Sequence, residues 1–124
     1  MGYAVADRVW GKKLVATAGD SRIVVDRIKQ ALYVPPVGDI RISTKFGMVY
    51  LTIGTKVLEM TAPVAVKVGF ALAKNGGACQ ALGDVVLFNI GGEQYTLLPD
   101  VAVQVGGGVL LKADKADDFQ RRVA

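Results

Sequence analysis

Two stretches of the chain repeat one order of apolar and polar positions, 37 residues apart. The first is VYLTIGTKVLEM, from Val49, and the second is VVLFNIGGEQYTL, from Val85, in which Val86 corresponds to Val49. Each has a β-branched or aromatic run, a turn signal at Gly54-Thr55 or Gly91-Gly92, and a second short run. Since glycine supplies the positive φ that tight hairpin turns need, each stretch predicts a β-hairpin.

An apolar segment follows each predicted hairpin, with VAVKVG at 64–69 returning as VAVQVG at 101–106. A proline, Pro63 or Pro99, stands near the start of each segment, where it fits the first turn of a helix. Large apolar residues (valine, then Phe70 and Leu72) alternate with alanine, lysine and glycine over 64–73, which also fits a strand, so periodicity alone leaves helix and strand open. We favour helices because LLKADKADDFQRR puts Leu110, Ala113, Ala116 and Phe119 on one helical face.

Small residues recur at a spacing of four in both apolar segments, as Ala65 and Gly69 and as Ala102 and Gly106. On a helix this spacing makes a shallow groove in which a second helix can approach closely and gain dispersion contacts. Such contacts would offset the roughly 1 kcal/mol that each helical glycine costs relative to alanine. The alternative for Gly106–Gly108 is a helix kink or a break between a strand and a helix.

The first 40 residues do not match the repeat. SRIVVDRIKQALY, from Ser21, predicts an amphipathic helix with Asp20 or Ser21 as its N-cap and Pro35-Pro36 as its end. VADRVWGKKLVA, from Val5, fits either a short helix or a strand broken at Gly11. DIRISTK, from Asp39, predicts a strand that places Arg41 and Lys45 on one face.

These elements predict an α+β protein in which two β-hairpin–helix units, about 48–74 and 85–119, form a small antiparallel sheet packed by helices. The units would be related by a pseudo-twofold axis and preceded by a basic N-terminal helical element. We expect one domain over 1–124, with the basic element at 1–47 and the repeat units at 48–74 and 85–122. Because 52% of the 124 residues are hydrophobic, the apolar excess predicts self-association as a homodimer.

The net charge of +4 comes entirely from the N-terminal third. Residues 1–47 hold eight Lys/Arg and four acids, whereas 48–124 hold seven of each sign. Aromatic rings are interleaved with these cations, and the combination suits single-stranded nucleic acid, which gains from phosphate contacts and base stacking. The alternative is that the rings belong to the core and the charges to an ordinary wet surface. The candidate nucleic-acid-binding residues are Arg8, Trp10, Lys12, Lys13, Arg27, Lys29, Tyr33, Arg41, Lys45 and Phe46.

The residue types argue against catalysis. The chain has no histidine and one cysteine, which excludes an internal disulfide, a Cys/His zinc site and a histidine proton relay. Cys79 falls in an expected connector and lacks a partner base. Asp114, Asp117 and Asp118 alternate with cations and predict a solvated helix face. We therefore expect no enzyme activity, no metal and no cofactor.

Glycine-rich stretches suggest a further hypothesis. No Walker spacing and no dinucleotide-binding fingerprint is present, so the glycines are expected to be structural. Capture of a small anionic ligand near Gly91-Gly92 or Gly106–Gly108 is the remaining option for them.

The sequence predicts a cytoplasmic protein without a membrane span. A lone cysteine suits a reducing compartment, and the first ten residues show no targeting segment. The most apolar stretch, 57–73, is interrupted by Glu59 and Lys67 and falls short of the roughly 20 apolar residues that a span needs.

The stretches VYLTIG…TAPVAVKVGFALAK and VLFNIGGEQYTLLPDVAVQVGGGVLLKADKADDFQ resemble hairpin-helix segments of small orphan proteins of bacteriophages and other mobile elements. Such proteins include single-stranded-DNA-binding transcription cofactors, inhibitors of host or defence proteins, and capsid accessory proteins. The resemblance implies a non-enzymatic accessory role in a bacterial host, as a transcription or replication cofactor that binds single-stranded DNA. The alternative is a protein-interaction module that inhibits a host or defence complex, or decorates a capsid, through its apolar surface.

Overall fold

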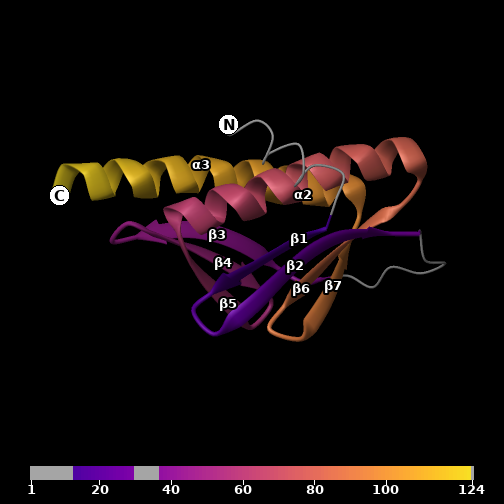
Figure 1. Ribbon diagram of the computed structural model, residues 1–124, viewed down its shortest axis with the longest axis horizontal. Coiled ribbons are helices and arrows are strands. Elements are labelled where there is room, and N and C mark those ends of the chain that lie inside the picture. The colour runs from indigo at the N-terminus through magenta and orange to yellow at the C-terminus, as the bar shows by residue number, and fades with distance from the viewer. Residues whose placement is uncertain (1–12, 30–36, 124) are drawn as a thin grey trace.

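The structure, a computed structural model, describes residues 13–29 and 37–123 and has an α+β fold with two antiparallel sheets and two helices (Figure 1). The first sheet has the order β1-β2-β6-β7, from strands Leu14–Ala18, Ser21–Ile28, Val85–Ile90 and Glu93–Leu97. The second has the order β3-β4-β5, from Ile40–Lys45, Met48–Ile53 and Lys56–Thr61. Helices α2 (Ala62–Leu82) and α3 (Pro99–Val123) lie side by side across the inner faces of both sheets.

The predicted basic N-terminal helix is wrong over its described part, because Ser21–Ile28 forms strand β2. Ile23 and Val25 are fully buried and alternate with Arg22 and Val24, which is the period of a strand. Pairing with β1 on one side and β6 on the other overrides the helical pattern. The segment before it, which fitted either a helix or a strand, is a strand from Leu14 onward. The expected helix end at Pro35-Pro36 lies outside the described residues.

Both predicted hairpins form, and each is followed by a helix: β4–β5 by α2 and β6–β7 by α3. Their turns use positive φ at Gly54 (60°) and Gly91 (57°), as the glycine signals predict. The expectation of one small sheet is wrong, because the hairpins lie in different sheets. The first strand of each hairpin pairs with an earlier strand, β4 with β3 and β6 with β2.

The strand pairs of the first hairpin recur in the second hairpin, shifted by the 37 residues of the sequence repeat. Val49 pairs with Met60 and Val86 with Leu97, so both partners are shifted by 37 residues. Their neighbours follow the same rule: Leu51 pairs with Ile42 on β3, and Phe88, 37 residues after Leu51, pairs with Val25 on β2. Strands β2 and β3 therefore hold corresponding places beside their hairpins.

Both apolar segments are helical, as favoured from the sequence. The hydroxyl of Thr61 accepts a hydrogen bond from the backbone N–H of Val64 (3.4 Å) and caps α2, and Pro63 lies in its first turn. The helix continues past residue 74 to Leu82 and ends at Gly83, whose N–H donates to the Cys79 carbonyl. The expectation that Cys79 lies in a connector is therefore wrong: the residue is buried in α2.

Close packing of α2 against α3 confirms the prediction from the small residues. A Cβ on Gly106 would lie 2.6 Å from the backbone oxygen of Gly69, and a Cβ on Gly69 would lie 3.0 Å from that of Gly106. Farther along α2, a Cβ on Gly76 would lie 2.7 Å from the Pro99 carbonyl, which explains why the helix tolerates glycine there. The helices meet backbone to backbone, so side chains larger than hydrogen do not fit at these points.

The core lies between the helix pair and the inner faces of the two sheets. Its largest fully buried side chains include Phe88, Ile23, Leu51, Met60 and Leu72. Many of the polar side chains of the strands lie on the outer faces of the two sheets. Neither of the described helices is long and apolar enough to cross a membrane.

Candidate nucleic-acid interface

The outer face of the second sheet combines cations with aromatic rings. We call it the β3–β5 face, and it consists of Arg41, Ser43, Lys45, Phe46, Met48, Tyr50, Thr52, Val57, Glu59 and Thr61. The burial alternates along each strand, with Val49, Leu51 and Ile53 turned to the core. Strand alternation therefore displays this set together on one side.

Phe46 stands at the tip of the β3–β4 hairpin and is 74% exposed. Its φ of 52° lies in the left-handed region, which residues other than glycine rarely adopt, and the neighbouring Gly47 has φ 78°. These values match a type I′ turn, in which Asn or Gly is the usual first residue. Lys45 Nζ lies 5.6 Å from the ring centroid, within cation–π range.

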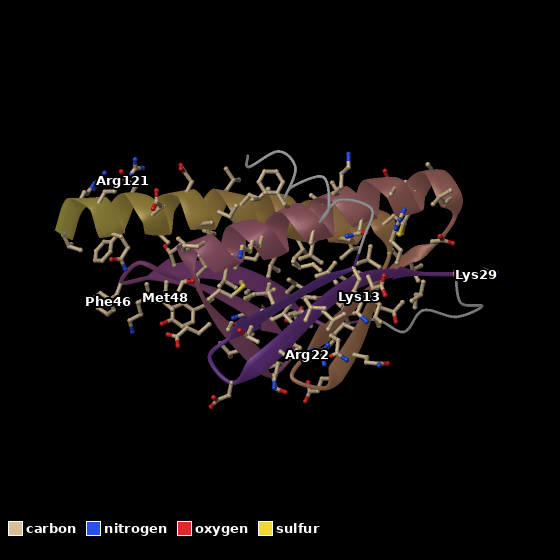
Figure 2. All side chains as sticks on the ribbon, viewed as in Figure 1. Lys13, Arg22, Lys29, Phe46, Met48 and Arg121 are labelled. Carbon is tan, nitrogen blue, oxygen red and sulfur yellow. The ribbon has the colours of Figure 1, made fainter. Side chains whose placement is uncertain are left out.

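The hairpin tip is held in place by the end of α3. A Cβ on Gly47 would lie within 2.2 Å of the Gln120 side chain, so the turn packs directly against this helix. Figure 2 shows Phe46 at this end of the molecule, near Met48 and projecting from the sheet. An exposed ring in a strained turn that rests on a helix is a preorganised contact point.

Tyr50 is the second ring of the β3–β5 face, and sequence reasoning missed it. Its hydroxyl donates a 2.6 Å hydrogen bond to Glu59 Oε2 on the neighbouring strand. That hydrogen bond raises the pKa of the Tyr50 phenol, with smaller contributions from burial and from the carboxylate charge. Alternation along 48–53 puts Tyr50 on the exposed side of β4, but only the pairing of β4 with β3 places it opposite Ser43 and on the same side as Arg41 and Lys45.

The structure brings together Arg41, Lys45 and Phe46 among the residues predicted to bind nucleic acid. Lys13 is exposed on the outer face of the first sheet, and Lys29 follows β2 at the end of the molecule opposite Phe46 (Figure 2). Arg27 is half-buried on the helix side of β2, close enough to act on Cys79. Arg8, Trp10, Lys12 and Tyr33 lie outside the described residues.

The outer face of the first sheet has a hollow of about 580 Å³. Gly91 and Gly92 line it together with Lys13 and Arg22, and so does the carboxylate of Asp20. The described residues of this face include no aromatic side chain, because Tyr95 packs against the core. The hollow thus offers mixed charge without a stacking ring.

Gly106 does not line the ligand cleft considered above, because the backbone of α2 fills the space beside it. Gly108 faces Ile42 of β3, whose Cδ1 would lie 2.7 Å from an added Cβ, and it lines a groove between α3 and β3 together with Lys112 and Lys115.

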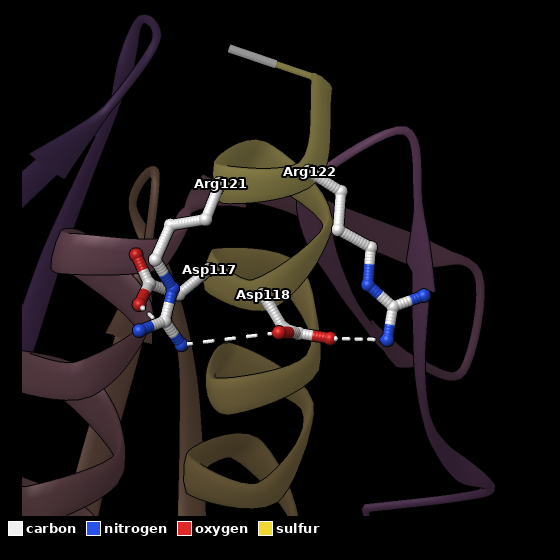
Figure 3. Close-up of polar contacts among 4 residues, drawn as sticks. All are labelled: Asp117, Asp118, Arg121 and Arg122. Atoms are coloured by element: carbon white, nitrogen blue, oxygen red, sulfur yellow. Dashed lines mark ion pairs between the residues drawn. The ribbon is translucent and has the colours of Figure 1, made fainter.

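The carboxylates near the end of α3 form a solvated face, as predicted. Asp117 and Asp118 pair with Arg121, and Asp118 also pairs with Arg122 at 2.8 Å (Figure 3). Both acids are about half exposed, so these pairs add little stability. No group of three or more potential metal ligands occurs in residues 13–29 and 37–123.

Cys79 shows no sign of activation in its surroundings. The side chain is fully buried in the core, and burial raises the pKa of its thiol, with a further contribution from Asp84. The thiol is therefore protonated and inaccessible at neutral pH.

Comparison of the chain with protein-family models, with curated proteins and with solved structures finds no match.

Proposed function

We propose that this protein binds single-stranded nucleic acid, preferably DNA, through the β3–β5 face, and acts as a non-enzymatic accessory protein such as a phage-encoded transcription or replication cofactor. The observation that carries the proposal is the exposed Phe46 ring, held in a left-handed turn between Lys45 and α3. A strained exposed ring costs stability, and a stacking role explains why it is there.

The two rings suit unpaired bases. Phe46 is 74% exposed, so a base can reach its ring, and Tyr50 is fixed by its hydrogen bond to Glu59 on the adjacent strand. Stacking of a base on an aromatic side chain contributes about 1–3 kcal/mol and tolerates any base. Bases inside a duplex are stacked on one another, so this arrangement favours single strands.

The cations suit the phosphates of the same strand. Arg41 and Lys45 lie two positions on either side of Ser43 along the exposed side of β3, and Ser43 is directly opposite Tyr50. A strand that stacks on Tyr50 and Phe46 would pass both cations. Glu59 is the acid of this face, and it reduces the positive potential beside Tyr50.

The shared register of the two hairpins supports a doubled hairpin–helix scaffold as part of the proposal. Gly69 and Gly106 are equivalent under the 37-residue shift, and they contact each other reciprocally, as residues on a pseudo-twofold axis would. We also retain the homodimer, for which sedimentation analysis is the test.

Fluorescence anisotropy with labelled oligothymidylate tests the rings. We expect Phe46→Ala and Tyr50→Ala each to weaken binding by about tenfold, as the loss of one stacked base would. Leu82→Ala is the control, because Leu82 is similarly exposed (63%) and lies at the end of α2, away from the β3–β5 face. Affinity that survives in both ring variants contradicts the proposal.

A further inference from the structure

We propose that the outer edge of β3 accepts an extended acidic segment of a protein partner as an added antiparallel strand, in the place that β1 occupies beside β2. This goes beyond nucleic-acid binding, because the partner is a protein strand held by the edge of β3 and the neighbouring surface of α3. Of the β3–β5 face, the proposed site shares only Arg41 and Lys45.

The pairing of β1 with β2 provides the template. β2 and β3 hold corresponding places beside their hairpins, but β2 pairs on both sides and β3 pairs only with β4 among the described strands. The helices follow the same correspondence: α2 packs against β1, β2 and β6, and α3 packs against β3 and β4. Within the described residues, the second sheet therefore has no strand in the place that β1 holds in the first sheet.

Backbone groups at this edge point outward. Along an antiparallel strand, the backbone N–H and C=O groups of successive residues point alternately toward the partner strand and away from it. The two residues that flank a two-residue hairpin loop are hydrogen-bonded to each other. Lys45 and Met48 close the β3–β4 loop. The N–H and C=O groups of Ile40, Ile42 and Thr44 therefore face the open edge. Exposed edge groups of this kind are what strand addition uses.

A groove beside the edge can receive the side chains of an added strand. It has a volume of about 480 Å³ and is lined by Ile40, Ile42, Gly108, Leu111, Lys112 and Lys115. Leu111 is 70% exposed although it belongs to this apolar surface. On β1 the corresponding inward positions are Leu14, Ala16 and Ala18, so the groove suits small and medium aliphatic side chains.

The positive charges around the groove favour an acidic partner strand. Lys112 and Lys115 flank the groove on α3, and Arg41 and Lys45 project from β3 on the other side. The acids nearest the end of α3, Asp117 and Asp118, are paired with Arg121 and Arg122. An added strand with acidic side chains turned outward would pair with the β3 cations.

The same cations disfavour a second copy of this chain at the edge. Antiparallel self-pairing of β3 centred on Ser43 would place Arg41 of one copy opposite Lys45 of the other. Like charges directly opposite each other destabilise a strand pair. An acidic partner strand meets no such repulsion.

The probe is a fluorescent peptide as long as β3, with glutamate alternating with leucine and alanine in the pattern of β1. We expect the full chain to bind it and to bind poorly both the version with lysine for glutamate and the version with the same residues in blocks. Equal binding of either control peptide would overturn the proposal, because charge or composition alone would then explain the binding. Absence of binding to the alternating peptide would overturn it as well.

Variants locate the site. Thr44→Pro removes one outward N–H at an edge position where proline is tolerated, and Leu111→Ser removes an exposed apolar contact; each should weaken peptide binding by about tenfold. Leu82→Ser and Lys67→Glu are controls at exposed positions of α2 and should bind as the parent does. If Thr44→Pro unfolds the protein, the Leu111→Ser result decides. Unchanged affinity in Leu111→Ser contradicts the groove.

Two further readouts separate this site from other occupants and from the proposed function. Sedimentation that shows a dimer dissociated by Leu111→Ser would assign the edge to a second copy and overturn the proposal. Phe46→Ala should weaken oligothymidylate binding by about tenfold and keep peptide binding, since Phe46 lies outside the groove. Failure of the peptide arm with intact oligonucleotide binding would therefore remove only this inference.

Discussion

At the scale of single residues, Phe46 links stability to function. The residue holds a φ of 52°, a conformation that costs a residue other than glycine about 1–2 kcal/mol. We predict that Phe46→Asn raises the free energy of unfolding by about 1 kcal/mol in urea denaturation, because asparagine accepts this turn conformation and an exposed ring contributes little to packing. The same variant should lose affinity for oligothymidylate. A variant that is less stable, or one that binds as well as the parent, contradicts this account of the turn.

Glu59 provides a second test at this scale. Glu59→Gln removes the negative charge from the β3–β5 face but keeps an oxygen that can accept the Tyr50 hydroxyl. We predict tighter oligothymidylate binding by about threefold, because a repelled phosphate is worth a fraction of a kcal/mol on an exposed surface. The pKa of Tyr50 should fall toward its ordinary value, since its hydrogen bond to the carboxylate is the main cause of the rise. Tyrosinate absorbance measures that pKa, and lowered affinity would place the phosphates elsewhere.

At the scale of elements, the contact between α2 and α3 determines which glycines are required for stability. Gly106→Ala would place its Cβ 2.6 Å from the backbone of both Gly69 and Ala73, so the helices must separate. We predict a loss of about 1–3 kcal/mol in the free energy of unfolding. The matched control is Gly107→Ala: no atom lies within 4 Å of its added Cβ, and helix propensity should raise stability by about 1 kcal/mol. Equal effects of the two substitutions would show that the glycines act only through propensity.

The elements also show what local sequence can predict. Both hairpins were predictable because Gly54 and Gly91 specify their turns locally. The helices were predictable because a proline stands near the start of each and because 110–119 has an apolar face at helical spacing. Strand β2 was not predictable, because its apolar run also fits a helix and because it forms a strand by pairing with β6, far along the chain. Cys79 was misplaced because Gly76 and Gly77 suggest a loop until the contact of Gly76 with α3 is known.

At the scale of the whole molecule, the candidate site was predictable in part. Arg41 and Lys45 followed from alternation along a single strand, and Phe46 from its place beside them. Tyr50 required the pairing of β4 with β3, which composition does not reveal. Charge counted along the chain placed Lys13, Arg27 and Lys29 in the same set, but the fold distributes them over other surfaces. Linear clustering predicts a surface only when the residues share an element.

The most direct test of the central claim compares two matched pairs of cations. Arg41→Gln with Lys45→Gln neutralises the β3–β5 face, and Lys13→Gln with Arg22→Gln removes the same charge from the outer face of the first sheet. Anisotropy titrations with oligothymidylate at several salt concentrations should show a weaker complex for the first pair. Its slope of log K against log salt should fall by about 1.4, the value for two lost phosphate contacts to a single strand. The second pair should keep the parent slope. Equal losses in both pairs, or no binding by the parent at low salt, would contradict the account.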